Sequence, residues 1–295
     1  MTAPEQPEQP EHPGGAWPAD GCDCHVHVIG DPMRHPMVPQ RHYTPGPASV
    51  AALRHHLDGL GLRRAVIVQP SVYGSDNRCL LESLEQLAGA GRGVAVPADD
   101  AAPAELRRLH AAGVRGVRLN LESSGNQDVA TLERLLVEWS GRIADLGWHL
   151  QLYAATDVVD RIAGRLATLP VKVVLDHFAL VAGAPGTPGT PGAGTVEDLL
   201  RSGRVLVKLS APYRLPSPAL ADAWARAFLA AAPEAVLWGS DWPHTARRPG
   251  AGAHEVSPYR DVPPDTLAAD LRTWLPTAEA RTRVLRDNPA ALYDF

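Results

Sequence analysis

Short apolar runs alternate with longer amphipathic segments along most of the chain, beginning near residue 21. Eight such runs lie at 21–28, 65–69, 93–96, 114–120, 149–153, 171–177, 205–210 and 236–241. They are nearly continuous in apolar residues, which is typical of parallel strands buried on both faces of a sheet. We therefore expect a parallel sheet that is covered by helices.

The segments between these runs have helical patterning, and several begin at good capping residues, namely Asp76, Asp128 and Ser217. They lie at 48–60, 76–88, 102–112, 129–146, 156–167, 195–202 and 218–231, followed by 265–275 and 277–286. Eight strand–helix units predict an α/β protein with a single (β/α)8 barrel of the TIM type. The alternative, an open doubly wound sheet, favours a Gly-rich phosphate loop after the first strand, where this chain has His-x-His.

Residues 1–19 are rich in Pro, Glu and Gln and nearly free of core-forming residues, which predicts a disordered tail before one barrel domain at 20–295. Two long loops interrupt the barrel pattern. The Gly/Pro/Thr-rich loop at 183–194 has low complexity, which argues against ordered contacts with a substrate. The loop at 244–264 follows the eighth strand directly and carries Arg247, Arg248 and Tyr259, so we expect it to cover the site.

Composition narrows the class of protein. The chain has a formal net charge of −5 and no basic block, so nucleic acid is not an expected partner. No apolar run is long enough to cross a membrane, and the N-terminus lacks a signal-peptide pattern. Three cysteines do not make a disulfide framework. We expect a soluble, cytoplasmic protein without a membrane partner; the sequence leaves its oligomeric state unknown.

The end of the first strand reads Asp23-Cys24-His25-Val26-His27. Alternate side chains of a strand share a face, so His25 and His27 are predicted to point the same way, with Asp23 below them and Cys24 on the opposite face. Two imidazoles there could hold a metal or polarise a carbonyl, whereas the simpler alternative is a pair of core histidines. Because a carboxylate, Asp241, ends the eighth strand, we favour a functional site.

Other strand ends carry further candidates, because the chemistry of such barrels lies at the C-terminal ends of the strands. They are Gln69, Arg118, Asn120, Tyr153, His177, Lys208, Ser210, Tyr213 and Arg214, with Tyr43 in the loop after the first strand. Asp176 precedes His177, is predicted to face the other way and is interpreted as structural. Six further histidines, at 35, 42, 55, 56, 110 and 254, are placed on loops or helix surfaces and are given no role.

Each candidate has a chemical role and an alternative. Asp241 could act as a general base, or it could instead cap the N-terminus of the segment that follows it. His177 could ligate a metal, bind a substrate oxygen, protonate a leaving group, or serve as a structural imidazole. Arg118 and Arg214 suit substrate carboxylates, because guanidinium binds them bidentately, although Arg118 could equally pair with an internal acid. Tyr153 and, more weakly, Tyr43 could donate to a substrate oxygen or only pack.

These strand ends resemble the amidohydrolase superfamily, in the amidohydrolase-related (amidohydrolase 2) group that contains lactonases of aromatic catabolism. The carrying segments are DCHVHVIG, RHYTP, VQPSVYGSDNR, AGVRGVRLN, LGWHLQLY, VVLDHF, KLSAPYR, VLWGSDWPH and DNPAALY, spread from Gly21 to Phe295. The resemblance implies water-dependent opening of a lactone. In it, Asp241 would activate water, and His25, His27 and His177 would polarise the carbonyl. Arg118, Arg214, Tyr43 and Tyr153 would hold substrate carboxylates.

The sequence departs from the group at one place. Lactonases of the group that act on a pyrone dicarboxylate carry a further basic pair shortly after Arg-x-Asn, where this chain has Leu121 to Gly125 with no basic residue. A less acidic lactone is therefore expected, and Glu122 would repel an anionic substituent if it faced the site.

The cofactor is left open. Arg118 and Tyr153 stand where metal-dependent members often place a His or modified Lys, so a binuclear site is not expected. Either no cofactor is essential, or one divalent metal, zinc above all, is held by His25, His27 and Asp241 with or without His177.

Four functions compete for this barrel. The first is a lactonase that takes a small carboxylate-bearing lactone. The second is a mononuclear metal-dependent decarboxylase of an aromatic or unsaturated acid, which would use the same His and Asp residues. An amide or other ester hydrolase and a catalytically inactive binding barrel are the remaining two.

Overall fold

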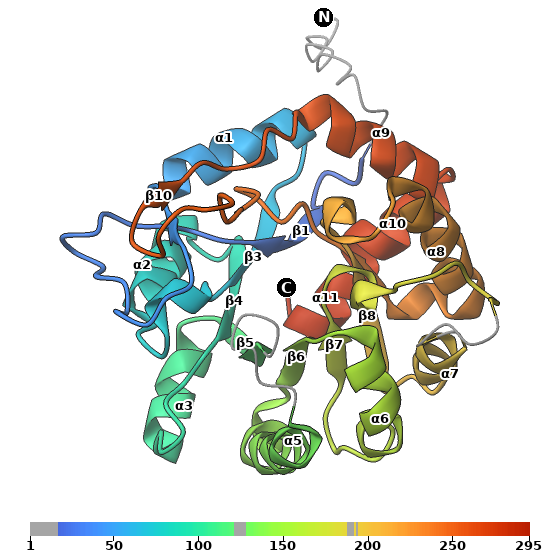
Figure 1. Ribbon diagram of the computed structural model, residues 1–295, viewed down its shortest axis with the longest axis horizontal. Coiled ribbons are helices and arrows are strands. Elements are labelled where there is room, and N and C mark those ends of the chain that lie inside the picture. Colours follow the sequence, from blue (N-terminus) through green and yellow to red (C-terminus); the bar gives the residue numbers. More distant parts are fainter. Residues whose placement is uncertain (1–16, 121–127, 188–191, 193) are drawn as a thin grey trace, which may run out of the picture.

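The computed structural model describes residues 17–120, 128–187, 192 and 194–295. Within these residues, eight parallel strands form one sheet in the order β1-β3-β4-β5-β6-β7-β8-β9. The strands are β1 Cys22–Val26, β3 Arg64–Val68, β4 Gly91–Ala95, β5 Val114–Asn120, β6 His149–Tyr153, β7 Val173–Leu175, β8 Val205–Leu209 and β9 Val236–Trp238. Each lies close to a predicted apolar run, and the predicted (β/α)8 barrel is confirmed (Figure 1).

The barrel closes through residues that follow the last strand. β9 ends at Trp238, and the chain then turns toward β1. The backbone N–H of Asp241 donates to the carbonyl oxygen of His25 at 2.9 Å, and that of His27 donates to Trp242 at 2.7 Å. This closing seam places the end of the eighth predicted strand beside the His-x-His of the first.

Helices cover the outside of the barrel (Figure 1). They are α1 Val50–Leu60, α2 Arg78–Leu87, α3 Pro103–Ala111, α5 Val129–Ile143, α6 Thr156–Leu166, α7 Thr195–Arg201, α8 Pro218–Ala231, α9 Pro264–Trp274, α10 Ala278–Thr282 and α11 Asn288–Tyr293. Asp128 and Ser217 accept hydrogen bonds from the first turns of α5 and α8, as predicted. Asp76 is not the cap of α2: that position is Asn77, whose side chain is turned to the backbone of Val96.

The last predicted helix extends further than the pattern indicated. A π-helical turn at Arg283–Asp287 joins α10 to α11, so the chain stays helical to Tyr293. The Tyr293 ring packs edge-on to His149 at 5.2 Å, and Arg115 pairs with Asp294 at 3.1 Å. His149 and Arg115 lie near the starts of β6 and β5, so the C-terminal segment closes the N-terminal end of the barrel and leaves the opposite end for a site.

The first strand departs from simple alternation. Its register against β3 shifts between Asp23 and Val26. As a result the Asp23 carboxylate faces His56 of α1, outside the barrel, at 3.4 Å, and does not lie below His25 and His27 as predicted. His56 is buried there, so its placement on a helix surface was also wrong.

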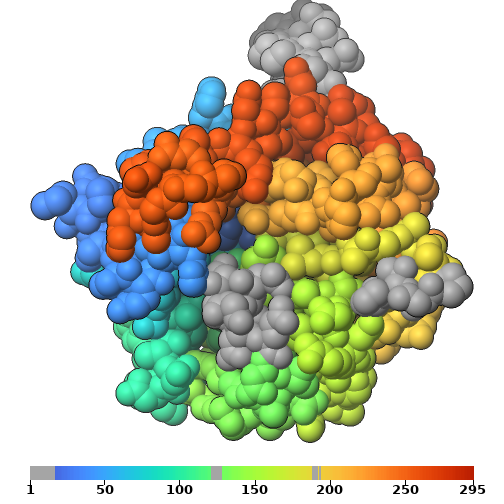
Figure 2. Space-filling view, in the orientation of Figure 1, coloured from blue at the N-terminus to red at the C-terminus, as the bar shows by residue number. Residues whose placement is uncertain are grey.

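Two segments border the open end. The short strand β10 Val256–Ser257 pairs in parallel with β2 Thr44–Pro45. Figure 2 shows the chain after β9 (orange) lying over the loop between β1 and α1 (blue). At the N-terminal side, Trp17 packs against the core although it falls within the predicted 1–19 tail; residues 1–16 of that tail lie outside the described residues. None of the helices described here could span a membrane.

Candidate active site

A pocket of about 490 Å³ opens at the C-terminal ends of the strands. Six of the eight predicted site residues line it: His27, Tyr43, Arg118, Tyr153, His177 and Arg214. The other two, His25 and Asp241, are fully buried, with Asp241 contacting His27, His177 and Arg214 of the lining. The structure therefore brings together all eight residues that the strand ends suggested.

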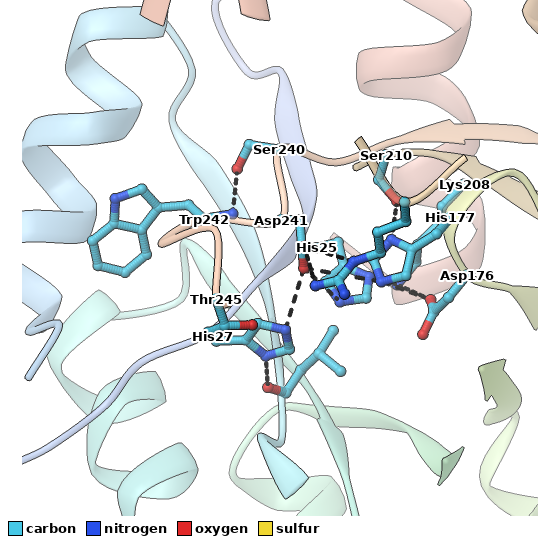
Figure 3. Close-up of polar contacts among 12 residues, drawn as sticks. His25, His27, Asp176, His177, Lys208, Ser210, Ser240, Asp241, Trp242 and Thr245 are labelled. Carbon is cyan, nitrogen blue, oxygen red and sulfur yellow. Dashed lines mark hydrogen bonds and ion pairs between the residues drawn. The ribbon is translucent and has the colours of Figure 1, made fainter. Parts of the chain in front are cut away.

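Asp241 is the centre of this arrangement. Its Oδ2 accepts hydrogen bonds from the Tyr213 hydroxyl at 2.7 Å and the Arg214 Nη2 at 2.8 Å. Its Oδ1 faces three imidazole nitrogens, the Nε2 atoms of His27 at 3.5 Å, His25 at 3.7 Å and His177 at 4.0 Å (Figure 3). Burial alone would raise the pKa of Asp241, but the Arg214 charge and the imidazoles hold it well below its usual value.

The three imidazoles are held through their Nδ1 atoms. His25 Nδ1 lies 3.3 Å from Asp176 Oδ1, His27 Nδ1 lies 2.8 Å from the backbone oxygen of Val68, and His177 Nδ1 lies 2.8 Å from Ser210 Oγ. Burial lowers the pKa of His25 to about 4, with the Lys208 charge acting in the same direction, so the ring is neutral near pH 7.

Asp176 faces the barrel interior, contrary to the prediction. The alternation argument fails because β7 ends at Leu175 and His177 adopts a left-handed backbone with φ of 50°. Both side chains therefore reach the centre of the barrel, where Asp176 lies 3.6 Å from the ammonium of Lys208 and accepts a hydrogen bond from Gln151 at 3.1 Å.

Lys208 was present in the strand-end list but had no role. It is fully buried and donates to Gln151 Oε1 at 2.7 Å, and burial lowers its pKa. A lysine within the apolar run VLVKL was the available signal, since a buried lysine needs an acidic partner.

A second buried network supports the turn that carries Asp241. Asp23 Oδ1 accepts from the backbone N–H of Ser240 at 2.9 Å, and His56 Nε2 lies 3.2 Å from Ser240 Oγ. Asp241 itself has φ of 62°, in the left-handed region that non-glycine residues seldom adopt. The network of Asp23, His56 and Ser240 thus holds the catalytic candidate in a strained backbone conformation.

A comparison with known proteins identifies the family. The family model described as "Amidohydrolase" matches residues 22–295. The chain belongs to the amidohydrolase family. This amidohydrolase is 35% identical over 289 residues to a 2-pyrone-4,6-dicarboxylate hydrolase of Comamonas testosteroni, covering 94% of this chain and 90% of that protein.

Two further relatives agree. The chain is 32% identical to a 4-sulfomuconolactone hydrolase of Hydrogenophaga intermedia, covering 95% of this chain and 89% of the relative. The crystal structure of a probable 2-pyrone-4,6-dicarboxylic acid hydrolase from Acinetobacter baumannii, with citric acid bound, is 25% identical and has a TM-score of 0.75 over 94% of this chain and all of that one. The predicted membership of the lactonase-containing group is confirmed.

The arginines of this amidohydrolase are partly engaged by the protein itself. Arg214 pairs with Asp241, and Arg118 donates from Nη1 to the backbone oxygen of Gln69 at 2.9 Å and lies 4.0 Å from Asp176. Arg118 Nε is buried without a hydrogen-bond partner in the described chain. Arg118 is therefore paired with an internal acid while its side chain also lines the pocket.

The loops differ in their relation to the pocket. Thr245, Ala246, Arg247 and Arg260 of the 244–264 loop line it, so this loop borders the site as expected. Of the described part of the 183–194 loop, no residue lines it. The stretch from Leu121 to Gly125, with Glu122, lies outside the described residues.

The donor set at the pocket floor fits a single cation. Candidate ligand atoms of His25, His177 and Asp241 lie within 4.8 Å of one another, and His27 Nε2 adds a third nitrogen, the fourth donor atom, near Asp241. His25 Nε2 and Asp241 Oδ1 are buried without a hydrogen-bond partner among the described residues. Unprotonated nitrogens and a carboxylate oxygen in this arrangement suit a divalent metal such as zinc.

Proposed function

We propose that this amidohydrolase opens a small, carboxylate-bearing lactone by attack of water. The observation that carries the proposal is the convergence of three imidazoles on one oxygen of Asp241 at the floor of a cationic pocket. Hydrolysis of lactones by the two relatives supports it, because their chains align with this one over almost the whole barrel.

Asp241 is the proposed general base. Tyr213 and Arg214 occupy Oδ2, so Oδ1 is the oxygen that can accept a proton from water. The low pKa of Asp241 keeps this carboxylate ionised throughout the neutral range, which holds water in position but makes the carboxylate a weak base. Efficient proton transfer then depends on strong polarisation of the lactone carbonyl, because a more reactive carbonyl needs a less basic partner.

Polarisation of the carbonyl has two possible sources at this floor. His177 lines the pocket and can direct its Nε2 at a substrate oxygen; such a hydrogen bond in a dry site contributes about 3 kcal/mol to stabilising the transition state. If a metal is held by His25, His27, His177 and Asp241, it supplies Lewis-acid polarisation and a more acidic water. Esters need less activation than amides, so both versions are chemically sufficient.

The walls of the pocket suit an anionic substrate. Arg118, Arg214, Tyr43 and Tyr153 line it, and none of its described lining residues is acidic. Of the two arginines predicted to bind a substrate carboxylate, Arg118 is the better placed, because Arg214 is already paired with Asp241. The proposed substrate is therefore a lactone with at least one carboxylate.

The direct test is turnover of a panel that contains 2-pyrone-4,6-dicarboxylate, 4-sulfomuconolactone and a lactone with one carboxylate. Ring opening should be detected with at least one of them, and Asp241→Asn should lower kcat about a thousand-fold. Retention of full activity by this variant would exclude Asp241 as the base. Release of carbon dioxide from an aromatic acid, without lactone opening, would replace the proposal with the decarboxylase.

A further inference from the structure

The hydrogen-bond partners of the imidazoles determine which nitrogen carries the proton. His27 Nδ1 faces a backbone carbonyl of Val68 at 2.8 Å, and a carbonyl can only accept. His25 Nδ1 lies 3.3 Å from the Asp176 carboxylate, which accepts, and 3.5 Å from the Lys208 ammonium, which donates. The carbonyl contact therefore places a proton on Nδ1 of His27, whereas the contacts of His25 Nδ1 are compatible with either tautomer.

The Nδ1 atom of His177 contacts a serine hydroxyl. It lies 2.8 Å from the hydroxyl of Ser210, and a hydroxyl can donate as well as accept. Ser210 is 1% exposed, and its hydroxyl has no other hydrogen-bond partner within the described chain. Rotation of the hydroxyl about the Cβ–Oγ bond thus lets Ser210 pair with either tautomer of His177 without moving a heavy atom.

The charge of Asp241 selects between the two tautomers. Asp241 Oδ1 is buried and has no hydrogen-bond partner among the described residues. A lone pair on His177 Nε2, 4.0 Å from this oxygen, would be repelled by the carboxylate, whereas an N–H there is attracted to it. In the metal-free protein this favours Ser210 as the donor and His177 Nε2–H as the group that faces the pocket.

We propose that Ser210 is a positioning residue that fixes His177 as the Nε2–H tautomer, so that His177 donates a hydrogen bond to the substrate oxygen. The proposal rests on the proposed lactone hydrolysis for the identity of that oxygen, but the tautomers themselves are a property of the protein without substrate.

The experiment is nitrogen-15 NMR of histidine-labelled, chelator-treated protein near neutral pH. His25→Gln, His27→Gln and His177→Gln variants assign the rings. We expect Nδ1–H for His27 and Nε2–H for His177. In Ser210→Ala the Nε2–H form of His177 should lose population, because its Nδ1 loses the donor.

Kinetics provide the second readout. Ser210→Ala should lower kcat by about 10- to 100-fold with little change in KM, and Ser210→Thr, which keeps the hydroxyl, should restore most of it. Ser140→Ala is the matched control, because Ser140 is equally buried and donates only to the backbone of Val137 in α5, so kcat should not change.

Nδ1–H at His177 in the wild-type protein, or an unchanged kcat in Ser210→Ala, would overturn the proposal. Failure of the wild-type protein to open any lactone of the panel would instead overturn the proposed function, and it would be visible independently of the NMR result.

Discussion

The backbone N–H of Asp241 donates to the carbonyl oxygen of His25 at 2.9 Å. Through this bond the chain after β9 completes the barrel against β1, and it sets the carboxylate beside the imidazoles. Two residues earlier, Gly239 lies so close to β1 that a Cβ there would come within 2.5 Å of the His25 Cβ and 2.7 Å of its backbone nitrogen. The geometry of the site thus depends on backbone contact at the closing seam.

Gly239→Ala should therefore impair both folding and activity. The added methyl group has to separate β9 from β1, because the contacted atoms include backbone, so the unfolding free energy should fall by about 1–3 kcal/mol and kcat should drop at least tenfold. Gly164→Ala in α6 is the control: nothing lies within 4 Å of a Cβ there, and the change should stabilise the protein slightly. Equal behaviour of the two variants in urea unfolding and turnover would contradict this account.

Lys208 should be essential for stability as the partner of Asp176. Lys208→Met leaves a fully buried carboxylate without its ammonium, which is expected to cost about 3–5 kcal/mol of unfolding free energy. The double variant Lys208→Met/Asp176→Asn should recover part of that loss, because the uncompensated charge is gone. Urea denaturation of the two single variants and the double variant measures the coupling; simple additivity would show that the pair does not interact.

Arg214 should determine the pH at which kcat/KM falls on the acid side of the pH–rate profile. Its charge is the largest influence that lowers the pKa of Asp241, and the ionised carboxylate is the active form. Wild-type kcat/KM should therefore hold down to about pH 4, the ordinary range of a carboxyl group, without loss from Asp241. In Arg214→Met the pKa of Asp241 rises and the acid limb should move to higher pH. A limb at the same pH in both proteins, measured in pH–rate profiles, is incompatible with this role.

Zinc should stabilise the protein if the floor of the pocket is a metal site. At a zinc concentration a hundred times the dissociation constant, a ligand that binds only the folded state adds about 2.7 kcal/mol. The gain, seen as a higher Tm, should disappear in His25→Gln, which removes a candidate ligand. It should persist in His254→Gln, because that histidine is exposed on the 244–264 loop and does not line the pocket. A gain that survives His25→Gln would place the ion elsewhere.

His149 should make the fold sensitive to acid. Burial and the Lys208 charge lower the pKa of His149 from 6.5 to about 3, so the folded state keeps it neutral. Below pH 6.5 the unfolded chain binds a proton that the folded protein does not, and stability falls as pH decreases toward 3, by up to about 1.4 kcal/mol per pH unit for one histidine. His149→Leu should flatten this slope in urea unfolding between pH 6.5 and 4; an unchanged slope would assign the acid sensitivity to other buried groups.

Much of this architecture could be predicted from local pattern alone. The apolar runs located all eight strands, because parallel strands buried on both faces have few polar positions. Since strand ends converge in a closed barrel, position in the sequence was also enough to collect His25, His27, His177 and Asp241 at one place. Neither result required knowledge of side-chain contacts.

The partners of those residues were decided only by the tertiary structure. Simple alternation placed Asp23 below the histidines and turned Asp176 away, and both placements were wrong, because a register shift and a left-handed backbone at His177 break the period of two. Three pairs join different strands or strand-end loops: Arg214 with Asp241, Lys208 with Asp176, and His177 with Ser210. The sequence determined which chemical groups reach the mouth of the barrel; the closed sheet decided which atoms face one another, because hydrogen bonds and charges act over a few ångströms that one strand's pattern does not specify.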